Sequence, residues 1–279
     1  MEKTLAKLEE NWKDITFEFT DHKDSGVKMI RLSEENFDML EENQVSVTAM
    51  FSSRYLATFE DKINYWQKSL AGISEIVIVV GEVQRSWSFL ENLFIHSDEV
   101  KKELPKESAQ FVSIDKEVRD ILADGFKHQK ALNFCVQPTV LPRLEKVQSD
   151  LTVCEKALNE FMDSKRIAYP RFYFVSPADL LDILSNGNNP EKVDDYLGDC
   201  FDGMKCLEFV RGDGIPYPSK RAKGMWSKEN EYVAFFKEYQ AVGAVENYLC
   251  NLEAMMQDTL KDVLVNAKRT ADMWDMGEK

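Results

Sequence analysis

Three histidines are the first side chains to consider for metal binding or proton transfer. His22, His96 and His128 are far apart in the sequence, and none has a histidine or cysteine at the spacing of a zinc site. The cysteines also lack a Cys-x-x-Cys pair; they are Cys135, Cys154, Cys200, Cys206 and Cys250. The sequence therefore predicts no metal site and five reduced thiols, as in a cytosolic protein.

Acid–base catalysis and phosphate binding are the next chemistries to test. Asp194-Asp195 and Glu41-Glu42 are adjacent carboxylate pairs, and we predict that both lie solvated on helix faces rather than at one catalytic site. The chain has no Gly-x-x-x-x-Gly-Lys-Ser/Thr, and Gly212-Asp213-Gly214 lacks a third glycine, which favours a hairpin loop. We therefore predict no catalytic residue and no cofactor-binding residue.

Two clusters favour binding over catalysis. The tightest cationic cluster comprises Lys220, Arg221 and Lys223. A solvated loop is its main interpretation, and contact with an acidic protein partner is the alternative. A stripe of large apolar side chains near the end of the chain comprises Met255, Met256 and Trp274. Helix core is the main interpretation of this stripe, and an interface is the alternative.

Composition limits the fold class and the partners. The apolar fraction of 44% and the charged fraction of 30% are typical of a soluble, helix-rich globular protein. With 35 basic and 49 acidic residues the net charge is −14, which argues against nucleic-acid binding. The longest apolar run, Ile76–Val80, is far shorter than the ~20 residues of a membrane helix. The N-terminus lacks the apolar core of a signal peptide.

The first third of the chain combines a hairpin with helices. Trp12–Phe19 and Val27–Leu32 are predicted as short strands, joined by the polar turn Asp21–Gly26. We expect this hairpin to cap a helical bundle. Ser33 is a predicted N-cap that opens a helix, and a second helix is predicted from residue 44 or 48 to 59.

Residues 59–94 form the longest periodic stretch, with an apolar residue at every third or fourth position. Gly72 and Gly81 lie inside it, and Ile76–Val80 prefers a strand locally. Because the period continues on both sides, we predict one long helix that is buried all round at Ile76–Val80. A bend near either glycine is the alternative.

Two further helices follow. One is predicted from Leu104 to Gly125, and a second long amphipathic helix from Leu144 is predicted to end before Pro170. The two prolines of Gln137–Pro142 break the pattern between them. We take this break as the division between two helical domains, residues 1–137 and 138–279.

The stretch after Pro170 has a distinct local pattern. Arg171–Val175 is aromatic and β-branched, which favours an extended buried segment. Ser176 is a predicted N-cap with Asp179 three residues later, and Asn186-Gly187 is predicted to end this short helix. A further helix is predicted to begin at Asn189-Pro190.

The last third predicts a small sheet and a final helix. Strands are expected at 205–209, 222–227 and 232–236, with a helix from Val242 to Val263. Residues 267–279 contain no helix stop, so we interpret the sequence as part of a longer polypeptide. The predicted fold is mainly α, an elongated helical-bundle rod with small antiparallel β elements.

Five segments, in register along nearly the whole chain, resemble the linker region of dynein heavy chains. They are Trp66–Leu70; Glu82–Glu91 (Glu-Val-Gln-Arg-Ser-Trp-Ser-Phe-Leu-Glu); Cys154–Leu158 with Lys165-Arg166; Pro170–Ser176 (Pro-Arg-Phe-Tyr-Phe-Val-Ser) with Asp179–Gly187; and Gly224–Ser227 with Glu231–Val233. The sequence of Asp179–Gly187 is most similar to that of axonemal outer-arm dynein heavy chains of the beta type.

The resemblance implies a force-transmitting element of a microtubule motor in the axoneme of a cilium or flagellum. In that family the linker bends and straightens across a ring of AAA+ modules during the ATP cycle. The ATP sites belong to the ring, so the resemblance implies no ATPase activity for this chain alone. It implies two partners, the AAA+ ring of the same heavy chain and other dynein subunits through the adjoining tail, and neither nucleic acid nor membrane. It also implies a hinge, for which Gly72, Gly81 and Gln137–Pro142 are candidates. The alternative is a passive helical scaffold or tether for protein–protein assembly; a helical enzyme is a third interpretation.

Overall fold

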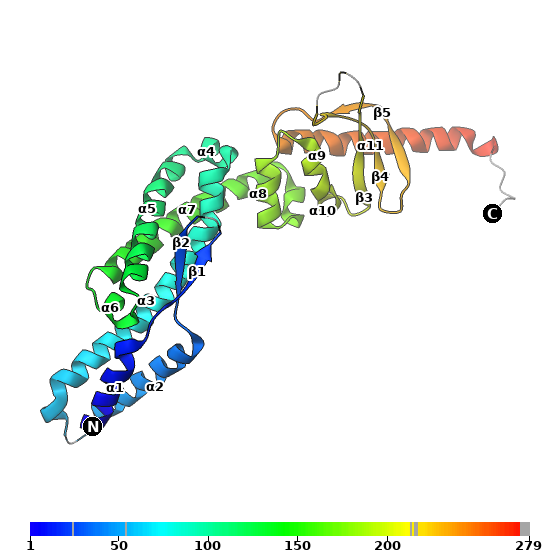
Figure 1. Ribbon diagram of the computed structural model, residues 1–279. Helices are drawn as coiled ribbons and strands as arrows, with labels where there is room; N and C mark the ends of the chain where they lie inside the picture. Colours follow the sequence, from blue (N-terminus) through cyan, green and yellow to red (C-terminus); the bar gives the residue numbers. More distant parts are fainter. Residues whose placement is uncertain (24, 54, 213, 215–216, 274–279) are drawn as a thin grey trace. The chain divides into compact units, whose positions relative to one another are not determined.

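The computed structural model is mainly α-helical with two small antiparallel sheets, which confirms the predicted fold class (Figure 1). It describes residues 1–23, 25–53, 55–212, 214 and 217–273, except the side chains of Glu99 and Asp272. The chain forms two compact units, Met1–Ala157 and Leu158–Lys279. No helix in the described part of the chain is both long and apolar enough to cross a membrane.

Unit 1 is a helical bundle with one β-hairpin. Its elements are α1 (Glu2–Asp14), β1 (Glu18–His22), β2 (Val27–Arg31), α2 (Glu34–Met50), α3 (Leu56–His96), α4 (Asp98–Glu103), α5 (Pro105–His128), α6 (Ala131–Cys135) and the first part of α7 (Val140–Ala168). The hairpin strands pair with Phe19 opposite Ile30. Asp24, in the predicted turn, lies outside the described residues.

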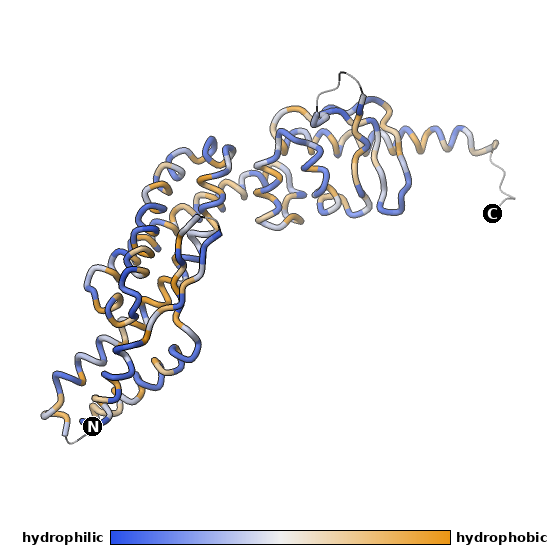
Figure 2. Tube along the Cα trace, viewed as in Figure 1, coloured by the Kyte–Doolittle hydropathy of each residue, from blue (hydrophilic) through white to orange (hydrophobic). Residues whose placement is uncertain are grey.

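Helix α3 is the longest element of unit 1 and confirms the prediction of one long helix. It runs unbroken for 41 residues through Gly72 and Gly81. Its buried residues recur every three or four positions, and apolar and polar residues alternate along it in Figure 2. The prediction that it is buried all round at Ile76–Val80 is wrong, since Ile78 is 51% exposed. The local preference of Ile76–Val80 for a strand is overridden by the packing of the buried face of α3 against the core.

Two predictions near the N-terminus are also wrong. The first strand was expected from Trp12, but Trp12 ends the buried face of α1 with Leu5 and Leu8, and β1 begins at Glu18. The spacings of three and four residues between Leu5, Leu8 and Trp12 favour a helix, and the buried Trp12 ring stabilises it. The second helix predicted from residue 44 or 48 to 59 is not a separate element, because α2 continues to Met50 and α3 already begins at Leu56. Ser33 caps α2 as predicted, since its Oγ accepts a hydrogen bond from the Asn36 amide at 3.3 Å.

The first half of α7 packs on α3 and α5. Leu144 of α7 lies with Val83 of α3 and Leu122 of α5 around a common core site. Arg143 pairs with Glu117 and Asp124 of α5. The compact units divide after Ala157, within α7, so the break at residues 136–139 separates two helices of unit 1. The division into 1–137 and 138–279 stays a prediction from sequence alone.

Unit 2 combines short helices, a three-stranded sheet and one long helix. Its elements after α7 are η1 (Pro170–Phe174), α8 (Pro177–Ser185), α9 (Pro190–Val193), η2 (Asp194–Tyr196), α10 (Leu197–Cys200), β3 (Met204–Phe209), β4 (Arg221–Ser227), β5 (Tyr232–Gln240), α11 (Val245–Thr270) and η3 (Ala271–Met273). The sheet is antiparallel, as expected, and its strand order is β3-β4-β5. The Tyr239 hydroxyl of β5 donates to the Tyr248 carbonyl of α11.

The segment after Pro170 corrects one prediction and confirms another. Arg171–Val175 was expected to be extended, but it winds into the 3₁₀ turn η1, which leaves Tyr173 and Phe174 exposed. Pro170 presets a helical φ, and the Phe172 amide donates to the Tyr169 carbonyl. Ser176 caps α8 as predicted, since its Oγ accepts from the Asp179 amide at 3.2 Å.

Candidate functional site

The histidines considered for metal binding lie apart at the ends of three different elements. His22 ends β1, whereas His96 and His128 are exposed at the ends of α3 and α5. No group of three or more His, Cys, Asp or Glu side chains in the described residues is placed to hold a metal ion. The described cysteines are free.

Burial makes three of the thiols poor nucleophiles. It raises the pKa of Cys135 to about 12 and the pKa values of Cys154 and Cys200 to about 11. A thiol reacts as its thiolate, so these three side chains stay protonated and inert near neutral pH. They serve as small apolar core residues.

Asp194 corrects the prediction that its pair is solvated. Its Oδ1 accepts a hydrogen bond from the Leu207 amide at 2.8 Å, so the carboxyl group caps the free edge of β3. Burial, with the neighbouring carboxylates of Asp195 and Glu191, raises the pKa of Asp194 to about 7. Glu41 and Glu42 are exposed on α2, as predicted.

The cationic cluster is not a solvated loop, because most of it lies in β4 beside acidic neighbours. Arg221 pairs with Glu238 of β5, and Lys223 Nζ lies 3.7 Å from Glu208 of β3. The apolar stripe divides: Met255 is buried and Met256 is half-buried. Trp274, and Asp213 of the predicted glycine loop, lie outside the described residues.

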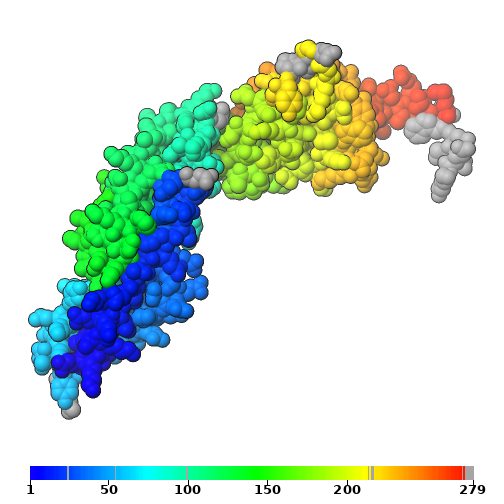
Figure 3. All heavy atoms as spheres, viewed as in Figure 1, coloured from blue at the N-terminus to red at the C-terminus, as the bar shows by residue number. Residues whose placement is uncertain are grey.

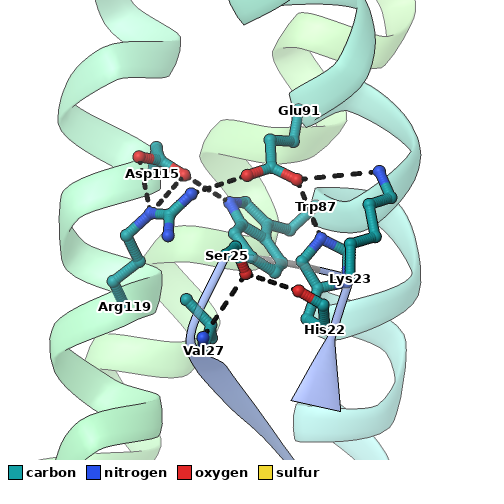
Figure 4. Close-up of polar contacts among 8 residues, drawn as sticks. All are labelled: His22, Lys23, Ser25, Val27, Trp87, Glu91, Asp115 and Arg119. Atoms are coloured by element: carbon teal, nitrogen blue, oxygen red, sulfur yellow. Dashed lines mark hydrogen bonds and ion pairs between the residues drawn. The ribbon is translucent and has the colours of Figure 1, made fainter.

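The one buried network of charges described in unit 1 joins the hairpin to α3 and α5 (Figure 4). Glu91 of α3 lies at its centre and is only 6% exposed. Its Oε1 accepts from Arg119 Nη2 of α5 at 2.6 Å, and its Oε2 accepts from His22 Nε2 at 2.8 Å. Lys23 Nζ lies 3.9 Å from Glu91 Oε2.

Asp115 and Trp87 complete this network. Arg119 Nε donates to both carboxylate oxygens of Asp115, at 3.0 and 2.9 Å, and Trp87 Nε1 donates to Asp115 Oδ1 at 2.9 Å. The Arg119 guanidinium also lies 5.3 Å from the Trp87 ring. Hydrogen bonding to Asp115, with the charge of Glu91, raises the pKa of Arg119 and keeps it cationic.

Two further contacts fix β2 to the bundle. Gln84 of α3 accepts from the Ile30 amide at 2.6 Å and donates to the Ile30 carbonyl at 2.9 Å. The Ile30 side chain fills the space beside Gly125 of α5, where an added Cβ would lie 2.2 Å from Ile30 Cδ1. The hairpin residues lie directly against the α5 region in Figure 3. We call these contacts, with the Glu91 network, the hairpin anchor.

The carboxylates of the hairpin anchor are occupied by hydrogen bonds within unit 1. Both oxygens of Glu91 and of Asp115 interact with donors of the fold. Removing one member of a buried charge pair typically costs ~3–5 kcal/mol, because the other charge is left uncompensated. The anchor therefore resists separation of the hairpin from the two helices.

Sequence reasoning missed the residues of the anchor. Gln84 and Glu91 lie on the same face of the predicted helix as Trp87, at spacings of three and four residues. Buried polar residues need hydrogen-bond partners, so the two polar residues on this apolar face could have predicted a buried contact there.

Unit 2 has ion pairs of a similar kind between η1, α7 and α11. Arg171 of η1 donates to both carboxylate oxygens of Glu253, each at 3.1 Å, and its guanidinium lies 4.7 Å from the Phe201 ring. Lys165 of α7 pairs with Glu246 at 2.8 Å, and both side chains are largely buried. These pairs hold the start of α11 against the segment that precedes α8.

The chain is similar to known proteins over most of its length. Residues 1–267 match the family described as dynein heavy chain, N-terminal region 2. The chain is 41% identical over 265 residues to the dynein alpha chain of the flagellar outer arm of Chlamydomonas reinhardtii. It is 39% identical over 267 residues to the ciliary dynein beta chain of Tripneustes gratilla and to human dynein axonemal heavy chain 17. These matches cover 95–96% of this chain and 6% of each relative.

Proposed function

The chain belongs to the dynein heavy chain family, and from this premise we propose that it is the force-transmitting linker segment of an axonemal dynein motor. In this role it bends and straightens across the AAA+ ring of its own heavy chain during the ATP cycle. The names of its relatives, flagellar outer arm and ciliary, support a place in the axoneme. Other dynein subunits would contact the heavy chain through the adjoining tail.

The hairpin anchor is the observation that carries this proposal. A force-bearing segment needs helices that do not slide past one another. Helix α3 would span roughly 60 Å at ~1.5 Å per residue, and it holds the hairpin and α5 through buried hydrogen bonds. Short hydrogen bonds lose their strength within a fraction of an ångström, so several together oppose sliding.

The same contacts support a mechanical rather than enzymatic role for this segment. Its buried carboxylates are engaged by donors of the fold, and three of its thiols are held protonated. We infer that the ATP sites belong to other parts of the heavy chain. This chain alone is then expected to hydrolyse no ATP.

Coupling between ATP turnover and movement tests the proposal. In a full-length heavy chain that carries this segment, Glu91→Ala and Gln84→Leu are expected to slow microtubule gliding several-fold, while basal ATP turnover changes less than twofold. Glu34→Ala, which removes an exposed ion pair with Arg31, is the matched control and should leave both rates unchanged. A passive tether predicts unchanged gliding even where melting shows that unit 1 has been loosened, and that result would reject the linker proposal.

A further inference from the structure

The long helix of unit 2, α11, is packed along only its first half. Its buried residues are Val245, Tyr248, Leu249, Leu252, Met255 and Thr259. From Leu260 to Thr270 no residue is buried, and in Figure 1 this part of α11 continues past the sheet. A short helix is marginal in water, and most helical stability in proteins comes from packing of one face. The second half of α11 therefore lacks the packing that helices of this length normally have.

This unpacked half nevertheless carries large apolar side chains in a row. Leu260 is 52% exposed, Val263 is 46% exposed and Leu264 is 70% exposed. With half-buried Met256 they occupy positions i, i+4, i+7 and i+8, which lie on one face of a helix. Single apolar residues on a surface are normal, whereas a contiguous row marks a surface that packs against another element.

The row continues the buried face of the first half of α11. Met256 lies four positions after buried Leu252, and Val263 lies four positions after buried Thr259. Residues four positions apart lie one above the other on a helix. The side of α11 that faces the core of unit 2 thus runs on beyond the end of that core. We call Leu260, Val263, Leu264 and Ala267 the α11 end face.

The polar residues of the same half are paired within the helix itself. Lys261 Nζ lies 3.3 Å from Asp258, Asn266 donates to Asp262 at 3.1 Å, and Arg269 donates to Asn266 at 3.0 Å. Each of these contacts joins residues three or four positions apart in α11, as on a solvated helix surface. One face of the helix therefore calls for an apolar cover, and the polar surface does not.

Two observations select the element that covers it. The chain spans 6% of the length of each relative, so under the proposed function most of the heavy chain lies outside it. Successive elements of a chain usually pack beside one another. Helix α11 ends at Thr270, one turn after Ala267, and the turn η3 follows it. A segment that continues from there begins close to the α11 end face and needs no long connection to reach it.

We propose that the α11 end face is covered by the heavy-chain segment that directly follows residue 279, within roughly the next 100 residues, the size of one domain. Leu260, Val263 and Leu264 then lie in an apolar core that this segment shares with α11, and their removal from water stabilises the contact. Helix α11 becomes the element common to unit 2 and the next unit. The inference rests on the proposed function in treating this chain as one segment of a longer heavy chain.

Photo-crosslinking in a full-length heavy chain identifies the covering segment. Val263 and Val265 are a matched pair, because both are exposed valines and they lie on opposite sides of α11. Each is replaced in turn by p-benzoylphenylalanine, which crosslinks to groups that it touches, and mass spectrometry identifies the crosslinked peptide. We expect the variant at Val263 to crosslink to the segment that follows residue 279. The variant at Val265 should give at least about tenfold less of that product.

A known contact controls the chemistry. The Phe126 ring lies 5.1 Å from the Phe19 ring, so Phe126→p-benzoylphenylalanine should crosslink α5 to β1. If that product forms, three results would overturn the proposal. They are no crosslink from Val263, equal products from Val263 and Val265, or a crosslink from Val263 to another subunit, a second heavy chain or residues 1–157.

Hydrogen exchange tests the same contact without a bulky residue. The amides of Leu260–Ala267 should exchange at least about tenfold more slowly in the full-length heavy chain than in the 279-residue chain, because packing suppresses local opening. Val263→Asp should restore fast exchange in the heavy chain, whereas Val265→Asp should not. Equal exchange rates in the heavy chain and in the 279-residue chain would contradict the proposal.

Failure of this proposal is distinguishable from failure of the linker proposal. Crosslinking and exchange are measured without ATP turnover, whereas the linker proposal is tested by gliding. An uncovered α11 end face in a heavy chain whose gliding depends on Glu91 would reject the packing of α11 alone. A covered face in a heavy chain whose gliding ignores Glu91→Ala would reject the linker role alone.

Discussion

Gln84 of α3 satisfies both main-chain hydrogen-bonding groups of Ile30 in β2, with its amide oxygen 2.6 Å from the Ile30 nitrogen and its amide nitrogen 2.9 Å from the Ile30 oxygen. A side-chain amide has the same donor and acceptor as a peptide group, so Gln84 takes the place of a third strand. A two-stranded hairpin is marginal alone, and this contact builds it into a helical bundle.

Replacing Gln84 by Leu should destabilise unit 1. The leucine fits the volume, but it leaves the Ile30 amide and carbonyl buried without partners, each at a cost of about 1–3 kcal/mol. We expect urea denaturation to show a loss of about 2–4 kcal/mol in the free energy of unfolding. Gln148→Leu, the same change at a surface contact with Glu82, is the control and should cost less than about 0.5 kcal/mol.

Replacing Glu91 by Ala should also lower stability, because it removes partners from His22 and Arg119. We expect a loss of about 2–3 kcal/mol, less than for a fully buried pair because Arg119 keeps Asp115. A double-mutant cycle with Arg119→Ala measures the coupling and should give about 1 kcal/mol or more. Additive effects would show that this pair does not stabilise the anchor.

Gly224 of β4 should not tolerate a larger residue. A Cβ at this position would lie 2.5–2.7 Å from the hydroxyl and two ring carbons of Tyr232, so this side chain must leave its place against the Trp226 ring. Gly224→Ala should therefore lower the melting temperature by several degrees, for a cost of about 1–3 kcal/mol. Gly203→Ala is the matched control, since its Cβ would meet nothing within 4 Å. Equal melting temperatures for the two variants would contradict the tight packing of Tyr232.

Asp194 should give unit 2 a pH-dependent stability. Its folded pKa of about 7 lies above the ordinary value of 3.8, so the folded chain binds the proton more tightly than the unfolded chain. The stability from this group is greatest below pH ~4 and falls as the pH rises to about 7. Asp194→Asn keeps an oxygen acceptor for the Leu207 amide and should raise stability at pH 8 by about 1–2 kcal/mol.

The control for this effect is Asp199→Asn, an exposed carboxylate in α10 that does not contribute to the raised pKa of Asp194. Chemical denaturation at pH 5 and at pH 8 should show the gain of Asp194→Asn growing with pH. A gain for Asp194→Asn that stays constant between the two pH values would mean that this carboxyl group does not titrate between them.

The fold was predictable from sequence where its causes are local. The Ser176 cap depends on an amide three residues away, and the period of α3 is visible along its own length. The anchor depends on residues that only tertiary folding brings together: His22 and Glu91 are 69 positions apart, and Gln84 and Ile30 are 54 apart. No local pattern specifies such a pairing, because it depends on which helix faces pack together.

The failures at η1 and Asp194 have the same origin. Aromatic composition favoured an extended segment at Arg171–Val175, but the bidentate contact of Arg171 with Glu253 suits the 3₁₀ turn. The local sequence at Asp194 favoured a solvated helix carboxylate, but in the structure its carboxyl group accepts a hydrogen bond from the Leu207 amide of β3. In both places a contact from a distant segment overrides local preference.

As a linker, this segment is expected to change conformation with the nucleotide state of its motor. Single-molecule energy transfer tests it most directly in a full-length heavy chain, with one dye at exposed Glu41 of α2 and the other on the AAA+ ring. The linker proposal predicts two transfer efficiencies that exchange as ATP is bound and hydrolysed. A single unchanging efficiency while ATP turns over would contradict it and favour a passive scaffold.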